Sequence, residues 1–140
     1  MIDIDKKADI DSPRPISNGV DEISYDDFAK LDIRIGTVTA AELVPETDKL
    51  IKCTVDFGQE LGTRTIVSGI AQWKKPEELV GRQFPYIVNL APRVLRGIES
   101  QGMLLAASPV RGDASNGASD ERTVVLIVPE TDVPPGTKLK

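Results

Sequence analysis

The sequence predicts an all-β protein built on one five-stranded barrel, with a short helix between the third and fourth strands. Five short segments show either a period-two alternation of apolar and polar residues or a run of β-branched residues, and both patterns are typical of strands. Segments that contain glycine and proline separate them at short intervals. A chain of 140 residues can bury a single core as one domain.

The amino-terminal part of the chain differs in composition from the rest. Residues 1–22 mix Asp, Lys, Pro, Ser and Gly without any period, which is typical of a disordered acidic arm. The folded domain is therefore expected at residues 23–140. Ser24 can cap a short N-terminal helix, because Asp27 stands three positions later, in the place of the acid of a capping box.

The first half of the barrel is expected to contain three strands. Residues 32–43 alternate at their start, and Gly36 in this segment suggests a bulge or bend. Residues 51–57 alternate cleanly, and residues 58–62 (GQELG) form a turn. Residues 64–71 are rich in β-branched residues and predict the third strand.

The second half begins with the predicted short helix at KKPEELVG. There Pro76 suits the first helical position and Gly81 ends the helix. Residues 84–90 alternate and predict the fourth strand, and residues 103–107 predict the fifth. Five strands with a helix between the third and the fourth are the arrangement of the oligonucleotide/oligosaccharide-binding barrel, the OB-fold.

The carboxyl-terminal region exceeds what one barrel needs. Residues 109–122 have the composition of a flexible surface loop, and residues 123–128 (TVVLIV) predict an extra, buried C-terminal strand. This strand and the N-terminal helix would offer apolar surface to a second subunit.

The composition excludes many functions. With no histidine, the chain cannot form a Ser-His-Asp triad, a Cys-His pair or a histidine-bound zinc site, and one cysteine cannot hold a thiolate cluster. Phosphate-loop and dinucleotide motifs are also missing from the sequence. We therefore expect no catalytic residues, no metal and no cofactor.

The same features bear on the compartment. No segment is long and apolar enough to suggest a membrane span, and the N-terminal sequence resembles neither a signal peptide nor a mitochondrial presequence. Cys53 is the single cysteine and cannot form an internal disulfide. A cytoplasmic protein without membrane contact is the expectation.

Charge is distributed unevenly over a chain whose net charge is −5. Residues 1–30 carry four bases and eight acids, which gives −4, whereas residues 81–111 carry four arginines and one glutamate, which gives +3. Arginine can pair with phosphate and stack on bases. The sequence therefore indicates a weak local basic surface on an acidic protein.

Several ungapped motifs resemble one family. FAKLDIRIGTV, TDKLIKCTVDFG, RTIVSGIA, PEELVGRQ, VNLAPRVLRGIESQGMLLAA and VPPGTK follow the order and spacing of the tRNA-binding domain family over residues 23–140. This family includes the C-terminal domain or β subunit of methionyl-tRNA synthetase and stand-alone tRNA-binding proteins. VSGIA and SQGMLLAA are more similar to the synthetase branch than to the export-chaperone-like branch.

The resemblance implies that the chain binds tRNA by shape, as a homodimer, alone or beside a catalytic aminoacyl-tRNA synthetase subunit. The family positions that contact RNA correspond here to Lys49, Asn89, Arg93, Arg96, Ser100 and Met103. The basic side chains suit phosphates, Asn89 and Ser100 suit a 2′-hydroxyl or a base edge, and Met103 suits an adaptable apolar contact.

Two departures from the family pattern favour an alternative function. Val44 replaces a frequent histidine before proline, and Val94 replaces a frequent lysine, which should weaken phosphate attraction. Together with the acidic pI, the missing lysine leaves open a chaperone-like dimer that binds apolar peptides.

For three residues the sequence leaves a structural role open as well. Asn89 could cap a turn, and Met103 could fill the core. Trp73 could anchor an interface or close one end of the barrel.

Overall fold

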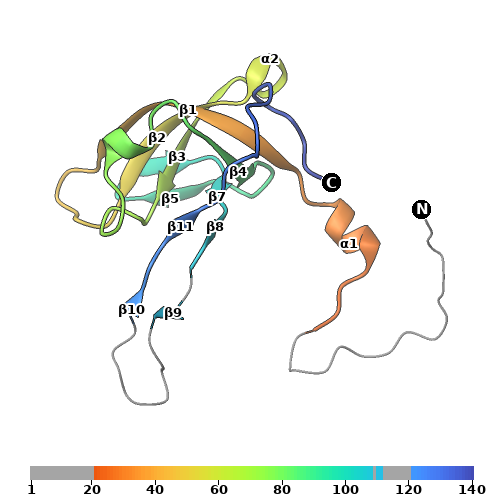
Figure 1. Cartoon of the computed structure of the whole chain (residues 1–140), viewed down its shortest axis with the longest axis horizontal. Helices are drawn as coiled ribbons and strands as arrows, with labels where there is room; N and C mark the ends of the chain where they lie inside the picture. The colour runs from red at the N-terminus through yellow and green to blue at the C-terminus, as the bar shows by residue number, and fades with distance from the viewer. Residues whose placement is uncertain (1–20, 109, 112–120) are drawn as a thin grey trace. The chain divides into compact units, whose positions relative to one another are not determined.

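Five strands of the chain form one antiparallel sheet that coils into a nearly closed barrel (Figure 1). The computed structural model describes residues 21–108, 110–111 and 121–140. The strands lie in the order β3-β2-β1-β4-β7; their bounds are Thr63–Ser68, Ile51–Asp56, Ile33–Leu43, Gln83–Ile87 and Met103–Leu104. The predicted all-β barrel of five strands is confirmed.

The long strand β1 pairs with β4 through its first half and with β2 through its second half. The register with β2 shifts between Val38 and Ala40, so the bulge lies at Thr39. A bulge at Gly36 itself, one of the two predicted possibilities, is wrong, because Gly36 pairs regularly with Phe84. A Cβ at this position would lie 2.4 Å from Cγ1 of Val55. Gly36 therefore serves the close packing of β1 on Val55 and Phe57.

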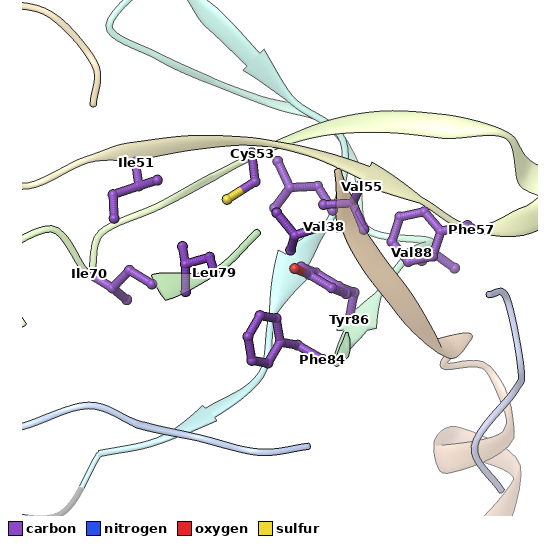
Figure 2. Close-up of a cluster of buried hydrophobic side chains, with 11 residues drawn as sticks. Val38, Ile51, Cys53, Val55, Phe57, Ile70, Leu79, Phe84, Tyr86 and Val88 are labelled. Carbon is purple, nitrogen blue, oxygen red and sulfur yellow. The ribbon is translucent and has the colours of Figure 1, made fainter. Parts of the chain in front are cut away.

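The core fills the barrel with buried side chains from β1, β2, β3 and β4 and from the segments beside them (Figure 2), and Leu104 of β7 packs against this cluster. Ile51, Cys53 and Val55 of β2 are buried and alternate with half-buried residues, as predicted. The rings of Phe57 and Tyr86 meet edge to face, with centroids 5.4 Å apart.

Strand β4 is buried along its whole length, although its sequence predicts one exposed face. Gln83 donates to the Val133 carbonyl at 2.7 Å and accepts from the Val133 amide at 3.0 Å. The predicted alternation also fails at Leu90, which lies after the strand and is 40% exposed. The C-terminal segment thus supplies partners for a strand face that would otherwise meet water.

The same segment runs along the first half of β1. The amide of Ile35 donates to the Thr137 carbonyl at 2.8 Å, and the amide of Leu139 donates to the Ile33 carbonyl at 2.8 Å. These bonds satisfy the β1 edge that β2 leaves unpaired.

Two short helices interrupt the barrel. The predicted turn at residues 58–62 contains α2 (Gly58–Leu61), a single helical turn. The predicted helix between the third and fourth strands is confirmed as η1 (Pro76–Glu78), a 3-10 helix that begins at Pro76. The Glu78 carboxylate accepts from the Lys75 amide at 2.7 Å and caps its start.

A hairpin that the sequence analysis did not predict lies between β4 and β7. Its strands are β5 (Arg93–Leu95) and β6 (Ile98–Ser100). The two residues of its turn, Arg96 and Gly97, have φ angles of 53° and 80°. Both positive angles are those of a type I′ turn, which favours glycine at the second position.

The predicted fifth strand is divided into β7 and β8 (Ala106–Ala107). Strand β8 pairs with β11 (Val125–Leu126), which corresponds to the predicted extra C-terminal strand. The prediction that residues 123–128 are buried is wrong, because Val125, Ile127 and Val128 are about half exposed. They border a two-stranded ribbon with one face open to solvent.

Within the predicted loop at residues 109–122, β9 (Val110–Arg111) pairs with β10 (Glu121–Arg122). The rest of that loop and residues 1–20 of the arm predicted at residues 1–22 lie outside the described residues.

The N-terminal helix α1 (Tyr25–Ala29) belongs to a unit separate from the barrel unit Leu31–Lys140. Its predicted cap is confirmed, since the Ser24 hydroxyl accepts from the Asp27 amide at 3.1 Å. No residue of α1 is buried, and Tyr25 is 77% exposed.

Candidate functional site

The β5–β6 hairpin presents two of the predicted arginines to solvent. Arg93 begins β5 and Arg96 occupies the turn, and both residues are exposed. Among the described residues, no carboxylate forms an ion pair with either guanidinium. By contrast, Arg34 is only 13% exposed and donates to Asp32 at 2.8 Å and to Glu60 at 2.9 Å. Arg93 and Arg96 thus keep their donors for a ligand, whereas Arg34 is structural.

Arg64 was not among the predicted site residues. It forms hydrogen bonds at both ends of the segment that contains this hairpin. Its Nη1 donates to the Val88 carbonyl at 2.6 Å and to the Gln101 carbonyl at 3.4 Å. Gln101 is further held by β3, since its amide donates to the Thr65 carbonyl at 2.8 Å. One side chain of β3 therefore fixes the chain just before and just after the exposed arginines. No sequence signal distinguishes Arg64 from the other bases.

Ser100 does not reach the surface with the arginines. Ser100 is 4% exposed. Its Oγ accepts from the Val67 amide at 2.9 Å and donates to the Gly102 carbonyl at 3.3 Å. These bonds attach β6 to β3 and help to close the barrel. The hydroxyl is thus engaged inside the protein.

Asn89 is exposed but already has an interaction within the barrel unit. Its Oδ1 accepts from the Asp32 amide at 2.9 Å and so joins the end of β4 to the start of β1. The bond joins two distant segments, so it does not test whether Asn89 caps its own turn.

Met103, Arg93 and the segment after Lys49 meet at a groove of about 290 Å³. Most of the groove is apolar, and its lining includes Leu50, Val67, Ile70, Arg93, Leu95 and Met103. Lys49 is exposed beside it, and its carbonyl accepts from the Ala71 amide at 3.1 Å. Met103 is 39% exposed and faces the groove as well as the barrel wall. The structure thus brings Lys49, Arg93 and Met103 into one neighbourhood, with Arg96 at the tip of the adjoining hairpin.

The titratable groups with shifted pKa values lie away from this groove. Hydrogen bonds from Arg34 lower the pKa of Asp32, and the carboxylates of Asp32 and Glu60 raise the pKa of Arg34. Burial raises the pKa of the Cys53 thiol to about 11 and also raises that of the Tyr86 phenol. These shifts belong to structural groups.

No cluster of three or more potential metal ligands occurs among the described residues. In the same part of the chain, no helix has the length and apolar character needed to cross a membrane. Trp73 is 40% exposed, and its two interpretations remain open.

Comparison with known proteins gives a consistent set of relatives. The family described as "Putative tRNA binding domain" matches residues 33–138. The methionine–tRNA ligase of Bacteroides fragilis is 48% identical over 118 residues, which are 84% of this chain and 16% of the ligase. The chain therefore spans about one sixth of the length of the curated relatives that it matches.

Two solved structures share the fold. A MetRS related protein from Pyrococcus horikoshii is 40% identical with a TM-score of 0.74, and the match covers 86% of this chain and all of that one. The chaperone CsaA from Bacillus anthracis is 35% identical with a TM-score of 0.70, and the match covers 85% of this chain and 99% of that one.

Proposed function

Because this chain belongs to the tRNA-binding domain family, we propose that it binds tRNA through the β5–β6 hairpin and the adjoining groove, without catalysing a reaction itself. The observation that carries the proposal is the pair Arg93 and Arg96. Both are exposed on one short hairpin, and no described carboxylate neutralises them. Guanidinium groups in this state can pair with the phosphates of an RNA backbone.

Recognition of RNA shape fits these side chains better than recognition of sequence. A-form RNA hides its base edges in a deep groove, so proteins contact its phosphates, its 2′-hydroxyls and its unstacked loops. Proteins that bind extended single strands use several aromatic platforms. In the barrel unit, Phe57, Phe84 and Tyr86 are buried in the core, which leaves Trp73 as its one exposed aromatic ring and does not provide several platforms. Folded RNA such as tRNA is the better ligand.

We also propose that the chain acts as a homodimer beside a catalytic aminoacyl-tRNA synthetase. Three cations per subunit, Lys49, Arg93 and Arg96, form a small patch on a chain of net charge −5. Two subunits would double the patch and raise the effective affinity. The ligase relatives support a synthetase partner, since the matched part is 16% of their length. A cytoplasmic location agrees with the buried, unpaired Cys53.

The test is tRNA binding by variants that remove charge without disturbing the turn. Arg96→Asn suits this purpose because asparagine tolerates the positive φ of 53° at this position. Combined with Arg93→Gln, it should weaken binding of total tRNA at low salt by about tenfold or more, since each lost charged hydrogen bond contributes roughly 1.5–3 kcal/mol. The control is Lys52→Gln, which removes a charge that pairs with Glu42 on β1. Equal affinity of the double variant and the control would refute the proposal.

A chaperone-like function is the second candidate. It is favoured by the similarity to CsaA and by the apolar lining of the groove. This alternative predicts binding of unfolded apolar peptides that persists at high salt, together with no measurable binding of tRNA.

A further inference from the structure

We propose that the groove beside the hairpin receives one unstacked base of the bound RNA; this inference rests on the tRNA-binding function proposed above. The groove lies where the end of β3, the strand β5 and the strands β7 and β8 approach one another. Its lining residues include aliphatic ones together with Arg93, which carries a guanidinium, and Met103, which carries a thioether. Both groups make favourable contacts with flat rings.

The size of the groove limits its occupant. An engineered cavity of about 150 Å³ admits a benzene molecule, and pockets for drug-sized ligands begin at about 300 Å³. The groove has about 290 Å³. It therefore has room for one base but not for a folded segment or for a row of stacked bases.

The positive charge of the groove favours a flat ligand that carries negative charge over an uncharged one. No aspartate or glutamate is present among the described residues that line it, and Arg93 supplies a positive charge. Arg96 follows at the hairpin turn, and Lys49 precedes the lining residue Leu50. A base enters such a site together with its own phosphates, which these cations attract. An uncharged peptide gains nothing from them.

Gly69 offers a way to fill the groove without removing any cation. It lines the groove, and its φ lies outside the region that favours glycine. A Cβ at Gly69 would meet only Cδ2 of Leu50 at 3.9 Å and the Lys49 carbonyl oxygen at 4.0 Å, which are ordinary contacts. Gly69→Leu should therefore fold and place its side chain where the base would lie. Thr63→Leu is the matched control, because it adds the same side chain at an exposed position at the start of β3, the strand that Gly69 follows.

The experiment compares total tRNA with a blunt-ended RNA duplex that has no unpaired base. Stacking of one base predicts that the wild-type chain binds tRNA at least about fivefold more tightly than the duplex. Gly69→Leu should remove this difference and leave duplex binding unchanged, whereas Thr63→Leu should retain it. Equal affinities of the two variants for tRNA would overturn the inference. Loss of peptide binding alone in Gly69→Leu would also overturn it and would assign the groove to peptides.

A second measurement needs no variant. The chain has two methionines, Met1 and Met103, so the Met103 methyl resonance is simple to assign. An aromatic base in the groove should shift this resonance upfield when tRNA is added but not when the duplex is added. An unchanged Met103 resonance with bound tRNA overturns the groove assignment while the proposed function stands. Failure of the wild-type chain to bind any tRNA refutes both.

Discussion

Two ionisable side chains, Cys53 and Tyr86, lie inside the barrel and contribute stability only while they are uncharged. Cys53 is 4% exposed and Tyr86 is 2% exposed. Burial raises the pKa of the Cys53 thiol from 9.0 to about 11. The folded state thus holds this proton more tightly than the unfolded state does. The contribution is complete below pH 9 and is lost as the pH rises through about 11.

A substitution that replaces the Cys53 thiol with an apolar group that cannot ionise tests this linkage. Ionisation of Cys53 should lower the free energy of unfolding from pH 9 upward, by about 2 kcal/mol near pH 11. Cys53→Val should abolish this decrease. Urea unfolding of both proteins at several pH values between about 8 and 11 measures it. Parallel stability curves for the variant and the wild type would contradict the prediction.

The Tyr86 phenol gives a second prediction at the same scale. Its hydroxyl forms no hydrogen bond with a described residue, and its pKa is raised by burial. Removing a buried donor that lacks a partner is neutral or stabilising. Tyr86→Phe should therefore raise the free energy of unfolding at neutral pH by up to about 1 kcal/mol. A loss of more than about 1 kcal/mol in urea unfolding would show that the hydroxyl has a partner.

At the scale of elements, the structure assigns to Arg64 the role of holding the functional hairpin in place. Its guanidinium joins the carbonyls of Val88 and Gln101, which flank the segment with Arg93 and Arg96. Arg64→Met should lower stability by about 1–3 kcal/mol, since it leaves buried acceptors unpaired, and it should also weaken tRNA binding. Amide exchange at Asn89 and Gln101, measured beside tRNA titrations, reports both effects.

Arg64→Lys separates positioning from charge. Lysine keeps the positive charge, but its nitrogen lies one bond closer to the backbone than Nη1 of Arg64, the single atom that donates to both carbonyls, so it falls short of that position. We expect Arg64→Lys to resemble Arg64→Met. Wild-type affinity in the lysine variant would mean that Arg64 contributes only its charge.

The elements differ in how far the sequence alone predicts them. β2 was predictable because its alternation reflects one core face and one outer face along the same strand. β4 was also predictable as a strand, but its burial on both faces was not, because its outer face is covered by residues about 50 positions later, such as Val133. The β5–β6 hairpin was missed because strands of three residues are too short to show a period, and the Arg96-Gly97 turn was its main local signal.

The residues of the candidate site also differ in how far the sequence alone predicts them. Arg93 and Arg96 are exposed to solvent. This agrees with the family resemblance, which was based on local sequence motifs. The position of Ser100 depends on Val67 from a different strand, so its burial has no local signal. The contribution of Arg64 depends on two carbonyls of distant segments. Contacts between strands therefore limit what a single sequence can indicate.

At the scale of the whole molecule, the barrel depends on its C-terminal segment. Gly136 has a φ of 90°, and a Cβ there would lie 2.2 Å from the Phe57 carbonyl oxygen. Gly136→Ala should therefore destabilise the protein by more than about 2 kcal/mol, through backbone strain and overlap together. Gly81→Ala is the control, because its φ of 84° is also positive but nothing lies within 4 Å of a Cβ there. Similar melting temperatures of the two variants would refute this dependence.

Because of the charge of the whole molecule, we expect its affinity for RNA to depend on the salt concentration and on the number of subunits that bind. The barrel unit carries 13 bases and 14 acids, a net charge of −1, so attraction comes from the local patch alone. With three phosphates per subunit and about −0.7 per contact, the logarithm of affinity should fall with the logarithm of salt at a slope near −2 for one subunit and near −4 for two. A dimer that engages both patches should show the steeper slope in tRNA titrations, with sedimentation confirming two subunits. A dimer with a slope near −2 would mean that only one hairpin contacts the RNA, because the second patch would then release no counterions.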